Sequence, residues 1–404
     1  MTRRSPIRPT RSRVLRLAAA ATALFTLAAC GGGAASSGGD SGEPFRIGAI
    51  YTLSGPTASI GEVYRSAAEL WVKENPTIAG RPVELVVRDD KGTTDGGTDA
   101  ARSLVDQEEV DAVVGRDLSG PTTAVLPVLT RAKTFSVTMS SLPEAGDPAE
   151  NPYTVQIEAQ KKLEAPSTVA AAASAGAPDL GLLVVDNPLG QTTVDTVNAA
   201  LPSSPGTRVV GVEKFQTGAT DVTAQVRKLV DEGATTLVIQ AVGVPDYATA
   251  LKAVQETGFS GPILGNSALA QPALAQSVPA DLLGRARASG FTPSVLGGSL
   301  TPQVEAFRTD LHTQLGTSDL TFFLYLAATS YDSFGLVKAA AEGAGSTDGQ
   351  AMVDHLVANP TEGLRLTYRF SADDHLGLRA EDLRWGVAGT FDDGVVQGDP
   401  SLSS

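Results

Sequence analysis

The residue types that most often carry chemistry are rare in this sequence of 404 residues. It contains one cysteine, Cys30, and three histidines, His312, His355 and His375. A single cysteine excludes an internal disulfide and a multi-cysteine metal site. The histidines are far apart and lack the spacing that would place two metal ligands on one helix face. We therefore expect neither a metal nor a cofactor.

The sequence also lacks the glycine-rich motifs that mark common enzymes. There is no Gly-x-Ser-x-Gly, no Gly-x-x-x-x-Gly-Lys, and no Gly-x-Gly-x-x-Gly at the first predicted helix. Ser267, in GNSAL, lacks the second glycine of a nucleophile elbow, and Asp89-Asp90 favours a solvated turn over an acid/base pair. A hydrolase using Ser267 or Ser119 would need a histidine near either loop. We therefore expect a protein that is not an enzyme.

Hydroxyl groups, glycines and helix starts are instead concentrated in six segments that follow apolar runs. These segments are SGPTASIG (54–61), RDLSGPTT (116–123), SSLPEAG (140–146), NPLGQTT (187–193), GVPDY (243–247) and NSALAQ (266–271). Hydroxyls and backbone N–H groups at helix starts suit a small polar or anionic ligand. Each serine, Ser119 included, could equally be an ordinary helix cap.

The six segments follow apolar runs that predict short buried strands. The runs are FRIGAIYTL (45–53), PVELVVRDD (82–90), VDAVVG (110–115), TFSVTM (134–139), LGLLVVD (180–186), RVVGVEKF (208–215), TTLVIQAVG (235–243) and GPILGN (261–266). Amphipathic segments lie between them, and this alternation predicts parallel sheets with right-handed crossovers. The pattern restarts near residue 160, which predicts two lobes. Ligands bind beyond the carboxyl ends of strands in such sheets, where the six segments lie.

One predicted helix has a clear buried face. In GEVYRSAAELWVKEN (61–75), Val63, Ala67, Leu70 and Trp71 recur at helical spacing. We expect all four side chains to pack on the first sheet.

The N-terminal segment has the pattern of an export signal. Six arginines and no acidic residue lie between Arg3 and Arg16, and the apolar run LAAAATALFTLAA (17–29) follows. The 13 residues of this run suit a signal peptide. They are too few for a bilayer span, which needs about 20. We therefore predict a signal peptide over 1–29.

The cysteine follows this segment directly. The sequence LAAC (27–30) resembles the lipobox of bacterial lipoproteins, in which a diacylglyceryl group is attached to the cysteine. The alternative is an ordinary signal peptide with an incidental cysteine. We predict a lipidated Cys30 and a flexible Gly/Ser linker over 30–44, and therefore an extracytoplasmic protein anchored to the membrane.

The charge balance limits the partners of the mature chain. The leader carries six of the 31 basic residues and none of the 45 acidic ones, which leaves a net charge of −20 without it. So acidic a surface argues against binding to nucleic acid or to anionic lipid through charge.

Several long segments together resemble one protein family. They are IGAIYTLSGPTASIGEVYRSAAELWVKE, GRPVELVVRDDKGTTDGGTDAARSLVDQEEVDAVVGRDLSG, NPYTVQIEAQ, TGATDVTAQVRKLVDEGATTLVI, ALKAVQETGFSGPILG, AATSYDSFGLVKAA and YRFSADDHLGLRAEDLRW. In order and spacing they are similar to the branched-chain amino-acid-binding class of periplasmic binding proteins. The resemblance runs from about residue 45 to about residue 395.

The resemblance implies the type I periplasmic binding protein fold, an α/β fold of two Rossmann-like lobes. Three hinge crossovers join the lobes, which close over a ligand in the cleft between them. Carried over to this chain, lobe 1 comprises 45–157 plus 291–361, and lobe 2 comprises 158–290 plus 362–395. The family delivers its ligand to an ABC permease and catalyses nothing.

The resemblance also implies positions for the ligand. In the leucine/isoleucine/valine binders, a serine after the third strand and a threonine after the fourth hold the ligand's carboxylate. Ser119 matches the first position, and Ser141 matches the second as serine in place of threonine. The Met139 backbone and Ser140 lie beside them in the sequence.

Four further positions depart from the family's pattern. Ile60 and Leu189 stand where the family often has an aromatic residue and a tyrosine, and Gly243 stands near another tyrosine position. Ser267 aligns with the acidic residue that pairs with the ligand's ammonium group. A buried ammonium without a carboxylate is costly. Either Asp117, Asp186 or Asp246 substitutes for that acid, or the ligand is not an α-amino acid, the interpretation we favour slightly.

Arg116 and Asp117 replace residues that are usually small in the family. A guanidinium binds carboxylates in a bidentate manner, so Arg116 is a candidate ligand clamp. The alternative is a local salt bridge within the loop.

Taken together, the sequence predicts a lipid-anchored solute-binding protein that captures an amino acid, amide or small carboxylate. We expect it to be a monomer that delivers this small molecule to an ABC permease. The alternative is a sensor of the same fold that reports its ligand to a signalling partner.

Overall fold

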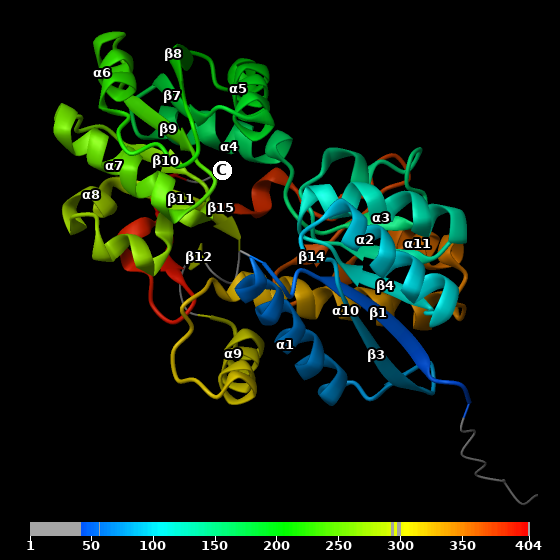
Figure 1. Cartoon of the computed structure of the whole chain (residues 1–404). Helices are drawn as coiled ribbons and strands as arrows, with labels where there is room; N and C mark the ends of the chain where they lie inside the picture. The colour runs from blue at the N-terminus through cyan, green and yellow to red at the C-terminus, as the bar shows by residue number, and fades with distance from the viewer. Residues whose placement is uncertain (1–41, 56, 292–294, 297–299, 403–404) are drawn as a thin grey trace, which may run out of the picture. The chain divides into compact units, whose positions relative to one another are not determined.

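Two six-stranded sheets organise the chain. The computed structural model describes residues 42–55, 57–291, 295–296 and 300–402. In Figure 1 the first sheet begins with the blue and cyan strands β1, β3 and β4, and the second contains the green strands β7 to β11. The predicted signal peptide, Cys30 and most of the linker lie outside the described residues.

The first sheet has the strand order β2-β3-β1-β4-β5-β6. Its strands are β2 (Thr77–Ile78), β3 (Arg81–Asp89), β1 (Phe45–Tyr51), β4 (Ala112–Gly115), β5 (Phe135–Thr138) and β6 (Thr154–Gln156). All neighbours pair in parallel except β2, which pairs antiparallel with β3. Side chains of β1 are buried on both faces, as a parallel sheet covered by helices requires.

The second sheet has the order β15-β11-β10-β9-β7-β8. Its strands are β15 (Leu383–Val387), β11 (Ala286–Phe291), β10 (Ile263–Gly265), β9 (Thr236–Gln240), β7 (Asp179–Val185) and β8 (Arg208–Phe215). Four of its five strand pairs are parallel, and the fifth, between β11 and β15, is antiparallel. Two short pairs complete the strands: β12 (Val295–Leu296) with β16 (Val396–Gln397), and β13 (Thr361–Glu362) with β14 (Thr367–Tyr368). The eight strands predicted from apolar runs are all present, and the predicted α/β class is confirmed.

Helices connect the strands and cover the sheets. They are α1 (Ala58–Glu74), α2 (Thr94–Arg102), α3 (Ser119–Ala132), α4 (Lys161–Ser174), α5 (Pro188–Ala200), α6 (Thr223–Asp231), α7 (Val244–Thr257), α8 (Ala280–Arg285), α9 (Pro302–Leu315), α10 (Leu324–Ala344) and α11 (Gly349–Ala358). Among the residues that are described, no helix combines the length and the apolar character needed to cross a membrane.

Helix α1 lies between two layers. Trp71 packs in the core of the first sheet, together with Tyr64 of the same helix. Val63, Ala67 and Leu70 instead pack against residues of α9 and α10. The prediction that all four periodic residues pack on the sheet is therefore wrong for three of them, because a second helical layer covers the outer side of α1.

Each sheet has its own apolar core, and each core holds one of the two tryptophans. Trp71 lies in the first core, where its ring centroid is 5.5 Å from that of Phe334 in α10. Trp385 of β15 lies in the second, where its Nε1–H donates to Ser167 Oγ over 2.8 Å. Both cores thus include side chains from the last quarter of the chain.

The chain passes between the two sheets more than once. Residues 157–160 lead from β6 to α4, and the segment after Phe291 leads from β11 towards α9. The chain returns to β15 after Leu376, which forms a parallel bridge with Gln156 at the end of β6. The exact bounds of the two lobes stay a prediction.

Candidate functional site

The predicted ligand loops lie where parallel strands end. In the first sheet, β4 is followed by Arg116 to Ser119 and the start of α3, and β5 by Met139 to Ser141. In the second sheet, Leu189 and Gly243 lie at the starts of α5 and α7, and Ser267 opens a 3₁₀ turn after β10. The sequence therefore placed the candidate residues correctly on the carboxyl edges of the two sheets.

Ser119 and Ser141 both expose their side chains on the first sheet's carboxyl edge. Ser119 is the first residue of α3, whose N-cap is Leu118, and no side-chain hydrogen bond caps this helix. The alternative role of Ser119 as a cap is therefore not observed. Both hydroxyl groups are accessible to a ligand.

Met139 and Ser140 are buried and hold the loop after β5 in place. The Met139 N–H donates to Gly115 O over 3.1 Å. Ser140 Oγ accepts from the Leu142 N–H over 3.2 Å, and Ser140 O accepts from Gln156 Nε2 over 2.6 Å. Ser140 thus has a role in shaping the loop, and Ser141 is the more accessible of the two serines.

Arg116 has an unusual environment. Its backbone adopts the left-handed conformation with a φ of 67°, and its N–H donates to Ile50 O over 2.9 Å. Its carbonyl accepts from Thr138 Oγ1 over 3.2 Å and from Thr122 Oγ1 over 3.3 Å. Because these bonds join Arg116 to β1, β5 and α3, the position of its backbone is fixed by all three elements.

The Arg116 guanidinium, by contrast, is buried without a partner. The residue is 0% exposed, and Nε, Nη1 and Nη2 find no hydrogen-bond acceptor among the described residues. Burial lowers the pKa of this group to about 9. A buried charge without a counter-charge costs several kcal/mol. The salt bridge expected as the alternative role for Arg116 is not formed with Asp117, whose Oδ1 is also unpartnered within the described part of the chain.

The three acids that might replace the missing acidic residue have different environments. Asp186 is exposed and accepts from Gln216 Nε2 over 2.9 Å. Asp246 is buried and accepts from the Gly218 N–H over 2.9 Å. Asp117 follows β4, and burial, with a smaller contribution from nearby Asp90, raises its pKa to about 6. Of the three, Asp117 is the acid with a fully buried oxygen, Oδ1, that has no hydrogen-bond partner among the described residues.

The pair Asp89-Asp90 forms a turn, but it is not solvated as expected. Asp90 is 0% exposed, and its Oδ1 accepts from Thr52 Oγ1 over 2.7 Å and from the Gly92 N–H over 2.8 Å. The expectation was wrong on burial because α2 begins over this turn, with the Thr93 N–H donating to Asp90 O. Asp90 organises the loop between β3 and α2.

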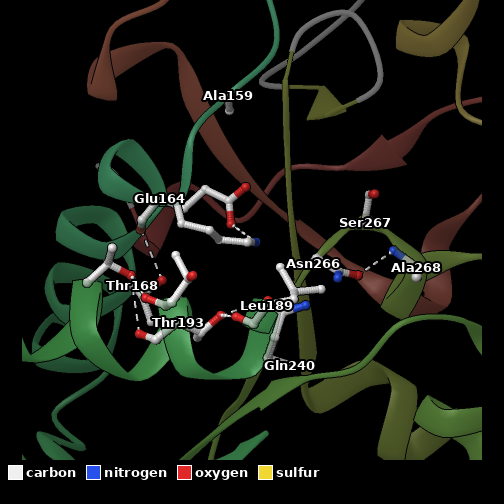
Figure 2. A network of polar contacts seen from close by, with 12 residues as sticks. Ala159, Glu164, Thr168, Leu189, Thr193, Gln240, Asn266, Ser267 and Ala268 are labelled. Carbon is white, nitrogen blue, oxygen red and sulfur yellow. Dashed lines mark hydrogen bonds and ion pairs between the residues drawn. The ribbon is translucent and has the colours of Figure 1, made fainter. Parts of the chain in front are cut away.

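The carboxyl edge of the second sheet combines apolar and polar groups. Leu189 is half-buried, and Val242, next to Gly243, is 53% exposed and so presents an apolar surface. Ser267 Oγ lies 3.4 Å from the hydroxyl of Tyr325 in α10. Figure 2 shows Leu189, Gln240 and Ser267, which come from three separate loops or strand ends, around the same edge.

A small polar cavity lies beside this edge. Its volume is about 30 Å³, and its lining includes Thr193, Gln240, Asn266 and the ion pair between Lys161 and Glu164. Part of this network is drawn in Figure 2, where Thr193 Oγ1 is 3.4 Å from Gln240 Oε1. The cavity has room for about one water molecule. It is too small for an amino acid or an aromatic acid.

Sequence reasoning missed a group of residues where the chain passes between the sheets. Arg365, in the segment GLRLTY, donates from Nη1 to Ile157 O over 2.9 Å and stacks on the rings of Phe291 and Tyr325. No sequence motif marks Arg365, because its partners are far away in the sequence. The group becomes visible only when the contacts between residues distant in the sequence are known.

A comparison with known families decides the class of the protein. The family described as "Periplasmic binding protein" matches residues 44–380. The chain belongs to this family. A periplasmic binding protein binds its ligand without chemical conversion, so the protein is not an enzyme, as the sequence predicted. Among curated proteins, none matches the chain.

Several solved structures have a similar fold. A periplasmic binding protein type 1 from Bordetella pertussis Tohama I has a TM-score of 0.73 at 19% identity, covering 89% of this chain and 100% of its own. A solute-binding protein of an ABC transporter from Rhodopseudomonas palustris, in complex with 4-hydroxybenzoate, has a TM-score of 0.70 at 19% identity, covering 88% and 96%. The leucine-binding protein LivK from Thermotoga maritima has a TM-score of 0.68 at 18% identity, covering 88% and 97%. At these identities the likeness establishes the type I periplasmic binding protein fold.

Proposed function

We propose that this periplasmic binding protein is the solute-binding component of an ABC transporter. It lies outside the cytoplasm, held to the membrane by a lipid on Cys30, and passes a small molecule to a permease. The family, the signal-like leader and the ABC-transporter protein among the similar structures support the proposal.

The ligand that we propose is a small carboxylate without an amine. The observation that carries this choice is the Arg116 guanidinium, buried on the carboxyl edge of the first sheet without an acceptor. A carboxylate is its natural partner, because two oxygens match two parallel N–H donors. Ser119 and Ser141 would add hydroxyl donors from the same edge.

Apolar side chains on the carboxyl edges of both sheets fit an apolar body on such a ligand. Ile60 and Leu189 are half-buried and Val242 is exposed, so each has apolar surface available. Ser267 offers a hydroxyl instead of a carboxylate. One similar protein binds 4-hydroxybenzoate and another is a leucine-binding protein. Both ligands combine a carboxylate with an apolar body.

Titration calorimetry with 4-hydroxybenzoate, 3,4-dihydroxybenzoate, leucine and leucine amide tests the ligand class. We expect an amine-free carboxylate to bind and leucine amide not to bind. In Arg116→Met, affinity should fall at least about 30-fold, the usual cost of removing one partner of a buried charge pair. Ser119→Ala and Ser141→Ala should each weaken binding about 2- to 10-fold, as expected for one hydrogen bond.

Arg285→Met is the matched control, because Arg285 Nη1 donates to the carbonyls of Phe259 and Gly261, which lie before β10 at the end opposite to the carboxyl edge. This variant should bind as the parent does. Equal affinities in the parent and Arg116→Met would refute the carboxylate clamp. Binding of leucine but of neither benzoate would instead assign the ammonium partner to an acid such as Asp117.

A further inference from the structure

Arg365 lies where the connections between the two sheets meet. It belongs to the segment between α11 and β14, and its neighbours belong to other connections. Ile157 follows β6 at the start of the first connection, and Phe291 ends β11 at the start of the second. Five residues are discussed at these connections: Glu158, Phe291, Tyr325, Asp332 and Arg365.

The backbone of Arg365 is fixed to α10. Asp332 Oδ2 accepts from the Arg365 N–H over 3.0 Å, and its Oδ1 accepts from the Leu364 N–H over 2.7 Å. The Tyr368 hydroxyl donates to the same Asp332 carboxylate over 2.8 Å. Asp332 is 4% exposed, so these bonds are shielded from water and hold the segment firmly.

The side chain of Arg365 reaches both connections. Nη1 donates to Ile157 O over 2.9 Å, and the guanidinium carbon lies 5.2 Å from the centre of the Phe291 ring. The Tyr325 ring lies on it at 5.6 Å, and the Tyr325 hydroxyl is 3.4 Å from Ser267 Oγ on the second sheet's edge. The Arg365 guanidinium therefore contacts the chain where it leaves the first sheet, at Ile157, and where it leaves the second sheet, at Phe291. It also contacts Tyr325, which lies next to Ser267 on the second sheet's carboxyl edge.

Two donors of this guanidinium remain unused. Arg365 is 3% exposed, and Nε and Nη2 have no acceptor within the described ranges. The nearest residue with a suitable acceptor in the sequence of the connection is Glu158, which directly follows Ile157. Its Oε1 accepts from the Ala159 N–H over 2.9 Å. Burial lowers the pKa of Arg365, but the nearby charges of Tyr368, Glu158 and Asp332 outweigh it and raise the pKa overall.

We propose that Arg365 is a positioning residue that sets the angle between the two sheets, and that Glu158 is its alternative acceptor. In one arrangement Arg365 is bound to the Ile157 carbonyl and stacked on Phe291 and Tyr325. In the other, the Glu158 carboxylate leaves the Ala159 N–H and accepts from the unused donors. The proposal does not depend on the identity of the ligand or on the Arg116 clamp.

Pulsed electron–electron spin resonance on the ligand-free, full-length chain tests this role. Spin labels replace the exposed residues Asp99 in α2 and Asp195 in α5, with Cys30→Ser removing the native thiol. We expect Arg365→Met to broaden and shift the distance distribution between the labels. Arg365→Lys keeps the charge but loses the planar fork, so it should cause the same change and provides the test if the methionine variant fails to fold.

A second set of variants tests whether Glu158 is the alternative acceptor for Arg365. Glu158→Gln should shift the distribution in the parent and have little effect in the Arg365→Met background, because its partner is absent there. Arg285→Met, which removes a guanidinium confined to the second sheet's layers, should leave the distribution unchanged. An unchanged distribution in both Arg365 variants would overturn the proposal. Equal Glu158→Gln shifts in both backgrounds would remove Glu158 from it.

Discussion

At the scale of single residues, Arg116 lowers the stability of the folded protein and is also the residue that we propose binds the ligand. Its guanidinium is fully buried with no acceptor in the described structure, so the folded protein bears the cost of desolvating a charge. In the carboxylate clamp that we propose, the ligand would supply the missing counter-charge and offset this cost.

This gives a prediction about Arg116 that is independent of the ligand. Arg116→Met should raise the free energy of unfolding by about 1–4 kcal/mol, by analogy with the gain seen when buried ion pairs are replaced by apolar groups of similar volume. Urea denaturation at neutral pH measures the change. Arg285→Met, which loses its bonds to two carbonyls, should instead be destabilised. A destabilised Arg116→Met would mean that the guanidinium has a stabilising partner.

Asp117 predicts a dependence of stability on pH. Burial raises its folded-state pKa to about 6, above the ordinary 3.8, so the folded protein binds the proton more tightly than the unfolded chain. Stability therefore falls as pH rises from about 4 to about 6 and stays lower above that. Asp117→Asn should be more stable than the parent at pH 7.5, by about 3 kcal/mol at most, and the gain should vanish near pH 4.

Denaturant titrations at the two pH values test this, with Asp186→Asn as control. Asp186 is an exposed carboxylate, so its replacement should change stability by less than about 1 kcal/mol at either pH. A pH-independent gain in Asp117→Asn would show that Asp117 is solvated in the folded protein.

The sequence located these residues but not their environments. Ser119, Ser141 and Arg116 were predicted on the carboxyl edge because strand ends are visible as the ends of apolar runs. The burial of Arg116 depends on contacts from β1, β5 and α3 together, and no local pattern encodes it. Arg365 was missed for the same reason, since Ile157 and Phe291 are far from it in the sequence.

At the scale of elements, close packing between α1 and β1 depends on a glycine. A Cβ added to Gly61 would lie 1.9 Å from Thr52 O, so the helix start would have to move. Gly61→Ala should therefore destabilise the protein by roughly 1–3 kcal/mol, as overpacking does. Thermal unfolding followed by circular dichroism measures this effect.

Gly335 in α10 is the matched control for Gly61. An added Cβ there meets nothing closer than Trp71 Nε1 at 4.0 Å, so the helix has room for it. Gly335→Ala should stabilise the protein by about 0.5–1 kcal/mol through helix propensity. Equal effects of the two substitutions would contradict the close approach of α1 to β1.

Strands were easier to predict than the layers around them. The eight apolar runs gave strands because both faces of a parallel sheet are buried and few polar residues interrupt them. β2, β6, β11 and β15 of the two large sheets were not among those runs. β2 and β6 are very short, and β11 (ARASGF) and β15 (LRWGV) are each interrupted by an arginine. The role of α1 as a middle layer was also missed, because periodicity identifies a buried face but not the element that covers it.

At the scale of the whole molecule, our proposal assigns attachment to the membrane to one thiol, that of Cys30. If Cys30 carries a lipid, Cys30→Ser should move the protein from the membrane fraction to the soluble fraction. Labelling of cells with an alkyne fatty acid, followed by fractionation, measures both effects. Arg285→Met provides a control that keeps the cysteine. Membrane retention of Cys30→Ser without label would assign attachment to the uncleaved leader.

Both apolar cores include side chains from the last quarter of the chain, so neither core can be completed until late in the protein's synthesis. Trp71 needs Phe334 of α10 as a neighbour, and the second sheet needs β15, which contains Trp385. A ribosome that has reached residue 320 has therefore made every strand of the first sheet but has completed neither core. Until then the nascent chain exposes apolar surface that the finished fold buries, which makes it prone to aggregation. A chain that is exported unfolded gains from this delay, because it cannot close into its final form before it crosses the membrane.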